Sequence, residues 1–132
     1  MKSKIFLSIK GGILATSALS FLIFISPYLG FPRISVWEVL AEKLQTSIFV
    51  GWVIHFIIGI FFAAIYLFWF RKRLWGNDAV RGMTFGLFPF VLSQMAALTT
   101  GGLDLLLFLG SLIGHLVYGL ILGLVTKNKA IF

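Results

Sequence analysis

Two histidines are the residues of this sequence whose type and position can support chemistry. His55 and His115 each interrupt a long apolar run, and small residues recur around both at intervals of four. An ionisable side chain within a membrane-spanning helix is costly to place there and usually marks a function. We therefore take the two histidines as the centre of a candidate site.

Three interpretations of the histidine pair are open. Each ring can be a satisfied polar contact between helices, with Gln94, Ser93, Ser20 or Tyr118 as a partner. The two rings can hold a haem b iron between them, because neutral imidazole is a common axial ligand. They can also bind another metal or relay protons, although the interior of the spans holds no carboxylate to complete a metal site. The candidate ligand- or cofactor-binding residues are His55, Gln94, His115 and Tyr118, and no catalytic set is predicted.

The small residues beside the histidines form two stripes. The members of the stripes are Gly51, His55, Gly59 and Ala63, and then Ser111, His115, Gly119 and Gly123. A spacing of four places each stripe on one helix face, and small residues there let helices approach closely in lipid. Close packing brings the helices together, whereas a haem between the histidines would hold them apart. We expect the small residues to serve helix packing.

The two stripes match each other at a constant offset of sixty residues. The runs that precede them also share a basic residue, a glycine and a small residue: Lys10, Gly11 and Ala15, and Arg81, Gly82 and Gly86. This similarity predicts two copies of a helical hairpin in the same orientation. Parallel repeats of this kind are known in membrane proteins.

Composition places the chain in a membrane. Hydrophobic residues make up 60% of the sequence and charged residues 11%, with a mean hydropathy of +1.06; soluble domains carry about 25% charged residues. A helix needs roughly 20 apolar residues to cross the hydrocarbon core. Four runs are near this length: 11–29, 48–70, 79–98 and 103–125. We predict an all-α membrane protein with four transmembrane helices in a single domain over 1–132.

Basic residues predict the orientation of these helices. Nine of the eleven lie before the first run, between the second run and the start of the third, or after the fourth. They are Lys2, Lys4, Lys10, Arg71, Lys72, Arg73, Arg81 (at the start of the third run), Lys127 and Lys129. Arg33 and Lys43 lie on the other side of the membrane in this scheme. Positively charged residues are enriched in cytoplasmic loops. Both ends of the chain are therefore predicted to be cytoplasmic.

The loop of residues 30–47 has a helical pattern of its own. Ser35 with Glu38 three residues on has the pattern of a capping box, and apolar residues recur at helical spacing from Trp37 onwards. We expect a short amphipathic helix at the outer membrane interface. The expected N-caps of the third and fourth spans are Asn77 or Asp78, and Asp104.

Several function classes lack the residues that they need. The sequence has no cysteine, which excludes disulfides and thiolate metal sites, and it shows no nucleotide-binding loop, zinc motif or catalytic triad. The basic residues lie at the ends of apolar runs, so nucleic acid is not an expected partner. We expect a non-enzymatic protein of the lipid bilayer, a small subunit or scaffold that forms a homo-oligomer or joins a larger membrane complex.

Two other functions stay open beside this one. A bis-histidine haem b protein would pass electrons within the outer half of the bilayer. A conduit for a small solute or for protons would need a continuous polar line from Gln94 through the histidines to the inner surface. An apolar groove on the exterior of the bundle would favour the subunit or scaffold.

Two segments resemble a known group of proteins. Residues 114–123, GHLVYGLILG, resemble the last helix of an uncharacterised family of small bacterial four-helix membrane proteins, and residues 51–66 are similar to its second helix. The resemblance implies a multi-pass protein of the bacterial inner membrane. It implies no activity, because that family has no assigned function.

Overall fold

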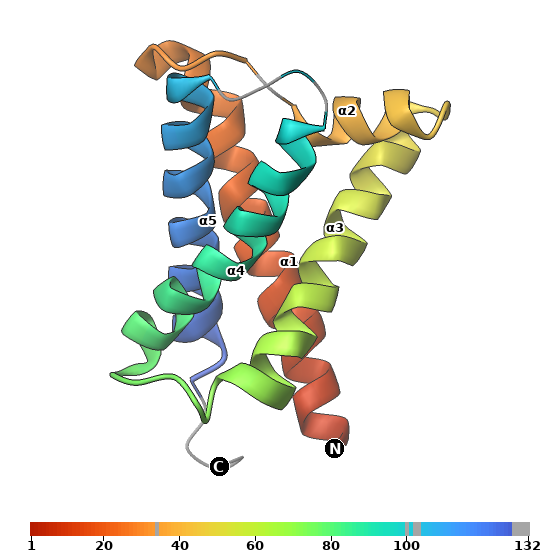
Figure 1. The fold of residues 1–132 in the computed structure, drawn as a ribbon. Coiled ribbons are helices and arrows are strands. Elements are labelled where there is room, and N and C mark those ends of the chain that lie inside the picture. Colours follow the sequence, from red (N-terminus) through yellow and green to blue (C-terminus); the bar gives the residue numbers. More distant parts are fainter. Residues whose placement is uncertain (34, 100, 102–103, 128–132) are drawn as a thin grey trace.

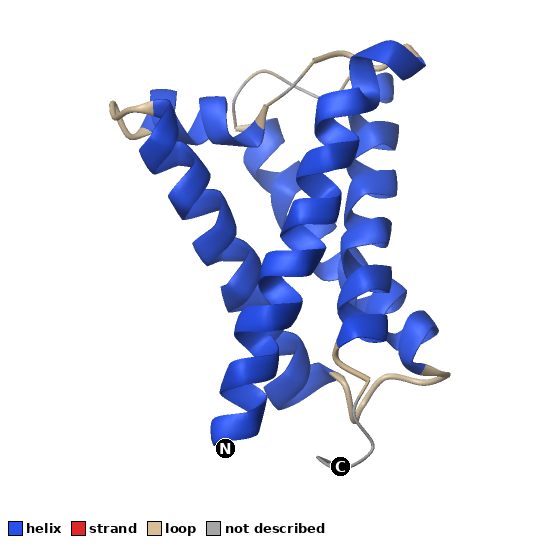
Figure 2. Cartoon of the chain, turned by 180° about the vertical axis from the view of Figure 1, so that it is seen from behind, coloured by secondary structure: helices blue, strands red, loops and turns tan. Residues whose placement is uncertain are grey.

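The computed structural model describes residues 1–33, 35–99, 101 and 104–127. Within this part of the chain, all regular elements are helices (Figures 1 and 2). The long helices are α1 (Lys2–Ile25), α3 (Ile48–Ile65), α4 (Asp78–Leu98) and α5 (Leu105–Val125), and the short α2 is Val36–Lys43. A 3₁₀ turn at Ser26–Leu29 continues α1, and a π-helical turn at Tyr66–Phe70 continues α3.

Three of the described helices are long and apolar enough to cross a membrane, whereas four were predicted. These three are Lys2–Leu29, Ile48–Phe70 and Leu105–Val125. Helix α4 has the length, 21 residues, but its sequence is less apolar. It contains the charged residues Asp78 and Arg81 and the polar residues Ser93 and Gln94. Its buried face also carries two glycines and a proline. The all-helical fold class is confirmed, and composition alone does not make α4 a span.

The long helices pack in a chain rather than in a closed ring. Helix α1 contacts both α3 and α5, and α4 packs mainly on α5. Helices α3 and α4 make few direct contacts. Helix α3 diverges from α1 toward the end where α2 lies across the top of Figure 1. We call this the α2 end. The start of α1 and the end of α5 lie at the opposite end (Figure 1), which we call the N-terminal end.

Large apolar side chains fill the N-terminal end. Tyr66, Leu67, Phe85 and Leu122 are almost fully buried and form one cluster. The Tyr66 and Phe85 rings lie 5.2 Å apart between centroids, which joins the end of the α3 span to α4. Aromatic side chains dominate the energetics of protein cores, so this cluster is the main apolar core of the molecule.

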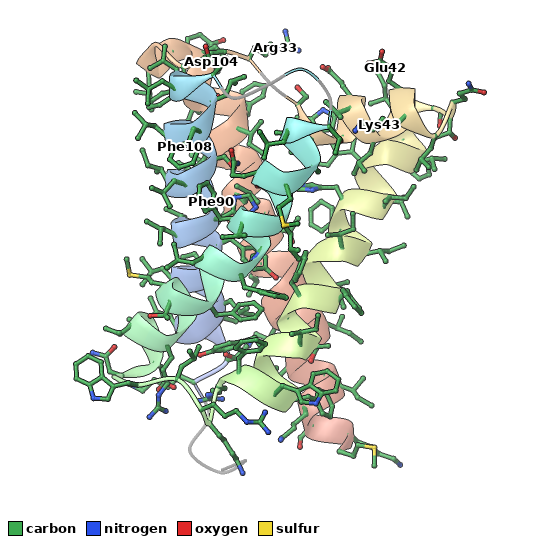
Figure 3. The ribbon with its side chains drawn as sticks, viewed as in Figure 1. Arg33, Glu42, Lys43, Phe90, Asp104 and Phe108 are labelled. Carbon is green, nitrogen blue, oxygen red and sulfur yellow. The ribbon has the colours of Figure 1, made fainter. Side chains whose placement is uncertain are left out.

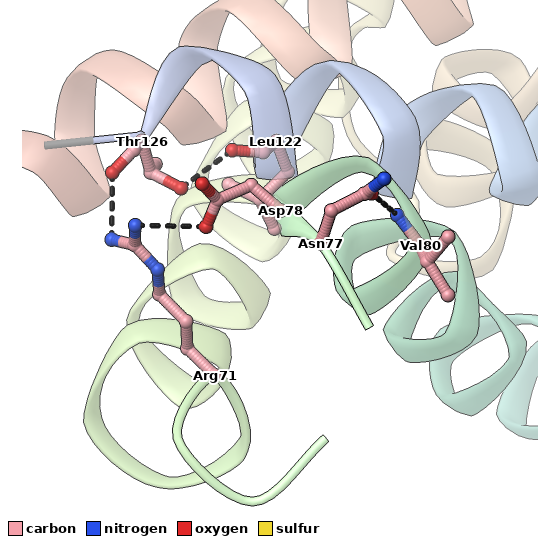
Figure 4. Close-up of polar contacts among 6 residues, drawn as sticks. All are labelled: Arg71, Asn77, Asp78, Val80, Leu122 and Thr126. Atoms are coloured by element: carbon pink, nitrogen blue, oxygen red, sulfur yellow. Dashed lines mark hydrogen bonds and ion pairs between the residues drawn. The ribbon is translucent and has the colours of Figure 1, made fainter. Parts of the chain in front are cut away.

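An ion pair and two hydrogen bonds fasten three chain segments at the same end (Figure 4). The buried Arg71 guanidinium donates to the Thr126 carbonyl at 2.7 Å and to the Asp78 carboxylate at 3.0 Å. Thr126 in turn donates its hydroxyl to the Leu122 carbonyl. Arg71 therefore holds the end of the π turn against the start of α4 and the end of α5.

The predicted external helix is present as α2, but its predicted capping box is not formed. Ser35 is the N-cap residue and makes no side-chain capping bond, while Glu38 pairs instead with Arg33 at 3.7 Å. Helix α2 is held by its apolar face, where Trp37 stacks on Trp52 of α3 at 3.8 Å. Because the helix is anchored through this ring, the missing capping bond does not prevent it from forming.

The other predicted N-caps are confirmed. The backbone N–H of Val80 donates to the Asn77 side chain at 3.0 Å, so Asn77 rather than Asp78 caps α4. The backbone N–H of Leu107 donates to the Asp104 carboxylate at 3.0 Å and begins α5.

Candidate ligand-binding cavity

A cavity of about 600 Å³ lies in the half of the molecule nearest α2, where α3 diverges from the other long helices. Residues of all five α-helices line it, and most of them are apolar. Its volume lies within the range of about 300–1,000 Å³ that is typical of sites for small molecules. The cavity is the candidate functional site because all four predicted ligand-binding residues line it: His55, Gln94, His115 and Tyr118.

Charged side chains gather at the α2 end, away from the histidines. Figure 3 shows Arg33, Glu42, Lys43 and Asp104 at this end, and Lys43 and Asp104 border the cavity there. Below them the walls are formed by apolar residues such as Phe108. A molecule inside the cavity would therefore meet charge at the mouth and an apolar wall further in.

His115 is fixed by its own helix. Its Nδ1 lies 2.7 Å from the Ser111 carbonyl oxygen, and a carbonyl only accepts, so Nδ1 carries the hydrogen. The edge of the ring lies against Phe90, 6.0 Å away between centroids, and Phe90 packs in turn on Phe108 (Figure 3). These contacts fix the tautomer and the orientation of the imidazole, and they leave Nε2 without a partner among the described residues.

Gln94 belongs to a hydrogen-bonded group between α4 and α5. Its amide nitrogen lies 3.0 Å from the Ser111 hydroxyl and 3.2 Å from the Ser93 hydroxyl. Ser93 donates its own hydrogen to the Phe90 carbonyl, so it can only accept from Gln94. The amide must therefore present NH₂ to the serines, which leaves its Oε1 as an acceptor.

His55 makes its polar contact on the other wall of the cavity. Its Nε2 lies 3.1 Å from the Ser20 hydroxyl of α1. Ser20 donates its hydrogen to the Thr16 carbonyl at 2.7 Å, so His55 is the donor of the shared bond. The hydrogen is thus on Nε2, and Nδ1 of a neutral ring is an acceptor.

Thr16 and Tyr118 lie at the deep end of the cavity. The Tyr118 hydroxyl donates to the Gly59 carbonyl at 2.6 Å and joins α5 to α3. Thr16 lies opposite Gly59, is 1% exposed, and its hydroxyl has no hydrogen-bond partner in the structure. The α3 backbone at Gly59 covers this hydroxyl, so it is not accessible from the cavity. Tyr118 itself is a link between helices.

The stripes of small residues face neighbouring helices. A Cβ on Gly59 would lie 1.8 Å from the Thr16 hydroxyl, and one on Gly119 would lie 2.1 Å from the Gly82 carbonyl. The other members lie similarly close: Gly51 against the Trp37 carbonyl, Gly123 against the Asp78 carbonyl, Ala63 fully buried and Ser111 bonded to α4. The first stripe packs on α1 and α2, and the second on α4.

This packing does not favour a haem between the histidines. The space beside each histidine, which a macrocycle would need, is taken by a neighbouring helix at Gly59 and Gly119. The Nε2 atom of His55 is engaged by Ser20. The described residues also bring together no group of three His, Cys, Asp or Glu side chains that could hold a metal ion.

The arrangement does not favour a conduit either. Such a pathway would continue from Gln94 and the histidines toward the N-terminal end. That route is filled by the apolar cluster around Phe85 and Leu122. In the described part of the chain, the polar groups of the cavity therefore end near Thr16 and Tyr118.

Thr16 lines the cavity but was not among the site residues predicted from the sequence. The signal that could have identified it is a third stripe with a spacing of four on the first helix, formed by Gly12, Thr16 and Ser20. Gly11 and Ala15 have the same spacing one residue earlier in the chain, so they indicated a different packing face for this helix. We call His55, Gln94 and His115 the polar lining of the cavity.

Comparison with known proteins gives one match. The model of a family of unknown function, DUF6789, matches residues 2–130. No curated protein and no solved structure matches the chain.

Proposed function

Because this chain belongs to the family of unknown function DUF6789, we propose its function from its own geometry. The chain is a small non-enzymatic membrane subunit that binds a lipid-soluble molecule in the cavity between α3 and α4. The observation that carries the proposal is the cavity itself, about 600 Å³ with mainly apolar walls and a few polar groups at depth. This combination is typical of small-molecule sites.

The proposal includes α4 as a fourth span. Helix α4 packs along α5, and its glycines face that partner: a Cβ on Gly82 or Gly86 would lie within 2.3 Å of an α5 carbonyl. Glycine and polar residues are tolerated in a span when a neighbouring helix covers them. The lower hydropathy of α4 is therefore consistent with a helix that turns its polar face to α5 and its apolar face to lipid.

The proposal also keeps two parallel hairpins. Helix α3 packs its histidine stripe on the preceding long helix α1, and α5 packs its own stripe on the preceding α4. This shared arrangement supports a duplication. In our proposal the N-terminal end is cytoplasmic and the α2 end faces the outside of a bacterial inner membrane, so the cavity lies in the outer leaflet. The surfaces that face lipid are available for a homo-oligomer or a larger membrane complex.

Saturable photolabelling tests the proposal. The protein is reconstituted in phosphatidylcholine nanodiscs with an apolar aryl diazirine, and labelled residues are mapped by mass spectrometry. Labelling at Leu19, which lines the cavity, should saturate with probe concentration. Labelling at Phe21, a lipid-facing residue of the same helix that is 63% exposed, should rise linearly.

A matched pair of variants completes the test. Ala97→Trp fills the cavity from α4 and should remove the saturable component at Leu19. Met95→Trp places the same ring on the exposed side of α4 and should leave it unchanged. If labelling of Leu19 is linear and insensitive to Ala97→Trp, the cavity is not a binding site.

A further inference from the structure

The hydrogen bonds of the polar lining indicate the chemistry of the molecule that would bind there. This step rests on the proposed function. His115 uses the N–H of its Nδ1 on the Ser111 carbonyl, so Nε2 presents a lone pair. Gln94 uses its amide hydrogens on Ser111 and Ser93, so its Oε1 presents lone pairs. Two groups on the α4–α5 side of the cavity are thus acceptors.

The α1–α3 side repeats this pattern. His55 uses its Nε2 hydrogen on Ser20, so its Nδ1 is also an acceptor. The Thr16 hydroxyl is packed against Gly59 of α3 and presents no accessible surface to the cavity. The polar lining therefore offers three acceptors, and a molecule that satisfies it must bring a hydrogen-bond donor.

The absence of nearby charge restricts the donor to a neutral group. The charged residues that border the described part of the cavity, Lys43 and Asp104, lie at the α2 end (Figure 3). An ammonium group near the histidines would be buried in apolar surroundings without a carboxylate, which is strongly unfavourable. A carboxylate would lack a cation and would meet acceptors. A hydroxyl group brings one hydrogen and no charge.

We propose that the cavity binds a lipid-soluble molecule through a hydroxyl group whose single hydrogen is shared between the acceptors Nε2 of His115 and Oε1 of Gln94. The apolar part of the molecule lies along the wall formed by residues such as Leu19 and Phe108. Aliphatic alcohols and phenols share this chemistry.

Three molecules of equal size separate the contribution of the hydroxyl from that of apolar contact. In the nanodisc assay, 1-dodecanol, 1-methoxyundecane and tridecane compete with the diazirine for the saturable label at Leu19. We expect 1-dodecanol to displace the probe at an about fivefold lower mole fraction than the ether, the effect of one added hydrogen bond. A second pair of isomers, 4-heptylphenol and 4-hexylanisole, shows whether a phenol is preferred over an aliphatic alcohol.

Two variants assign the preference to the polar lining. Gln94→Leu and His115→Phe should each reduce the ratio between alcohol and ether toward one, while displacement by tridecane persists. Ser26→Ala changes a hydroxyl on the cavity wall that is already bonded to the Ile23 carbonyl, and it should keep the full ratio. If His115→Phe does not fold, Gln94→Leu alone decides the assignment.

The outcomes separate this inference from the function on which it rests. Equal displacement by alcohol, ether and alkane overturns the hydroxyl inference and leaves the binding function standing. Stronger displacement by the ethers shows that the lining donates, which also overturns it. If none of the competitors displaces the probe and the label at Leu19 never saturates, the proposed function itself fails.

Discussion

The guanidinium of Arg71 lies 3.0 Å from the carboxylate of Asp78, and this pair is the polar link between the two halves of the chain at the N-terminal end. The same guanidinium donates to the Thr126 carbonyl. Next to this link, Tyr66, Phe85 and Leu122 pack together in one buried apolar cluster. The helices are therefore joined at the N-terminal end, while α3 and α4 lie apart at the α2 end with the cavity between them.

Loss of this link should destabilise the protein. Arg71→Met removes the charged partner of Asp78 and the donor to Thr126, and hydrogen bonds to charged groups contribute about 1.5–3 kcal/mol. We expect a free energy of unfolding lower by about 2 kcal/mol, measured by denaturant titration in detergent with tryptophan fluorescence. The control is Arg73→Met, because Arg73 is exposed and, among the described residues, donates within its own segment to the Trp69 carbonyl. Equal losses in both variants would contradict the role of the link.

The stability of the protein should also depend on the close approach of α4 and α5 at Gly119. A Cβ at this position would lie 2.1 Å from the Gly82 carbonyl, which is backbone and cannot move aside. Gly119→Val should force α4 and α5 apart and cost about 1–3 kcal/mol, the range for overpacked cores. The same unfolding assay measures it.

The matched position for this test is Gly110 on the same helix. A Cβ there meets the Phe31 ring at 3.2 Å, and a side chain can shift. Gly110→Ala should therefore change the unfolding free energy much less than Gly119→Ala. If the two alanine variants are equally stable, α4 and α5 are not held at the distance that the structure shows.

Much of the fold is predictable from hydropathy, because an apolar run of the right length leaves the chain few alternatives in lipid. The start of α3, the end of α5, the caps at Asn77 and Asp104, and helix α2 all follow from the sequence. The capping box at Ser35 does not form, because local sequence cannot show that Arg33 will bind Glu38. The polar residues of α4 could likewise not be interpreted from local sequence, because the contact of α4 with α5 explains them.

The sequence identified four residues that line one cavity, but not the geometry in which they lie. His55, Gln94, His115 and Tyr118 were identified because polar residues in apolar runs are conspicuous, and they do line one cavity. Their roles depend on tertiary contacts. The engagement of His55 by Ser20 and the orphan hydroxyl of Thr16 require the crossing of α1 and α3, and nothing in either helix alone fixes the height at which they cross.

The position of α2 over the cavity should depend on one aromatic stack. Trp37 of α2 lies on Trp52 of α3 at 3.8 Å with a 12° angle between the rings, and such pairs contribute about 0.5–1.5 kcal/mol beyond burial. Trp52→Leu should raise hydrogen exchange across Val36–Lys43 with little change in the exchange of α5. The control is Trp75→Leu, because Trp75 is 88% exposed. Unchanged exchange in α2 would show that another contact holds it.

The membrane topology can be tested directly because the sequence has no cysteine. Trp75→Cys places a single thiol before α4, and Thr99→Cys places one after it. If α4 is a span and the N-terminal end is cytoplasmic, a membrane-impermeant maleimide should label Cys at position 99 in intact cells and Cys at position 75 only after permeabilisation. Glu42→Cys on α2 should behave like the variant at position 99, because both lie at the α2 end. Labelling of positions 75 and 99 from the same side would leave three spans and place α4 along the membrane surface, against its packing on α5.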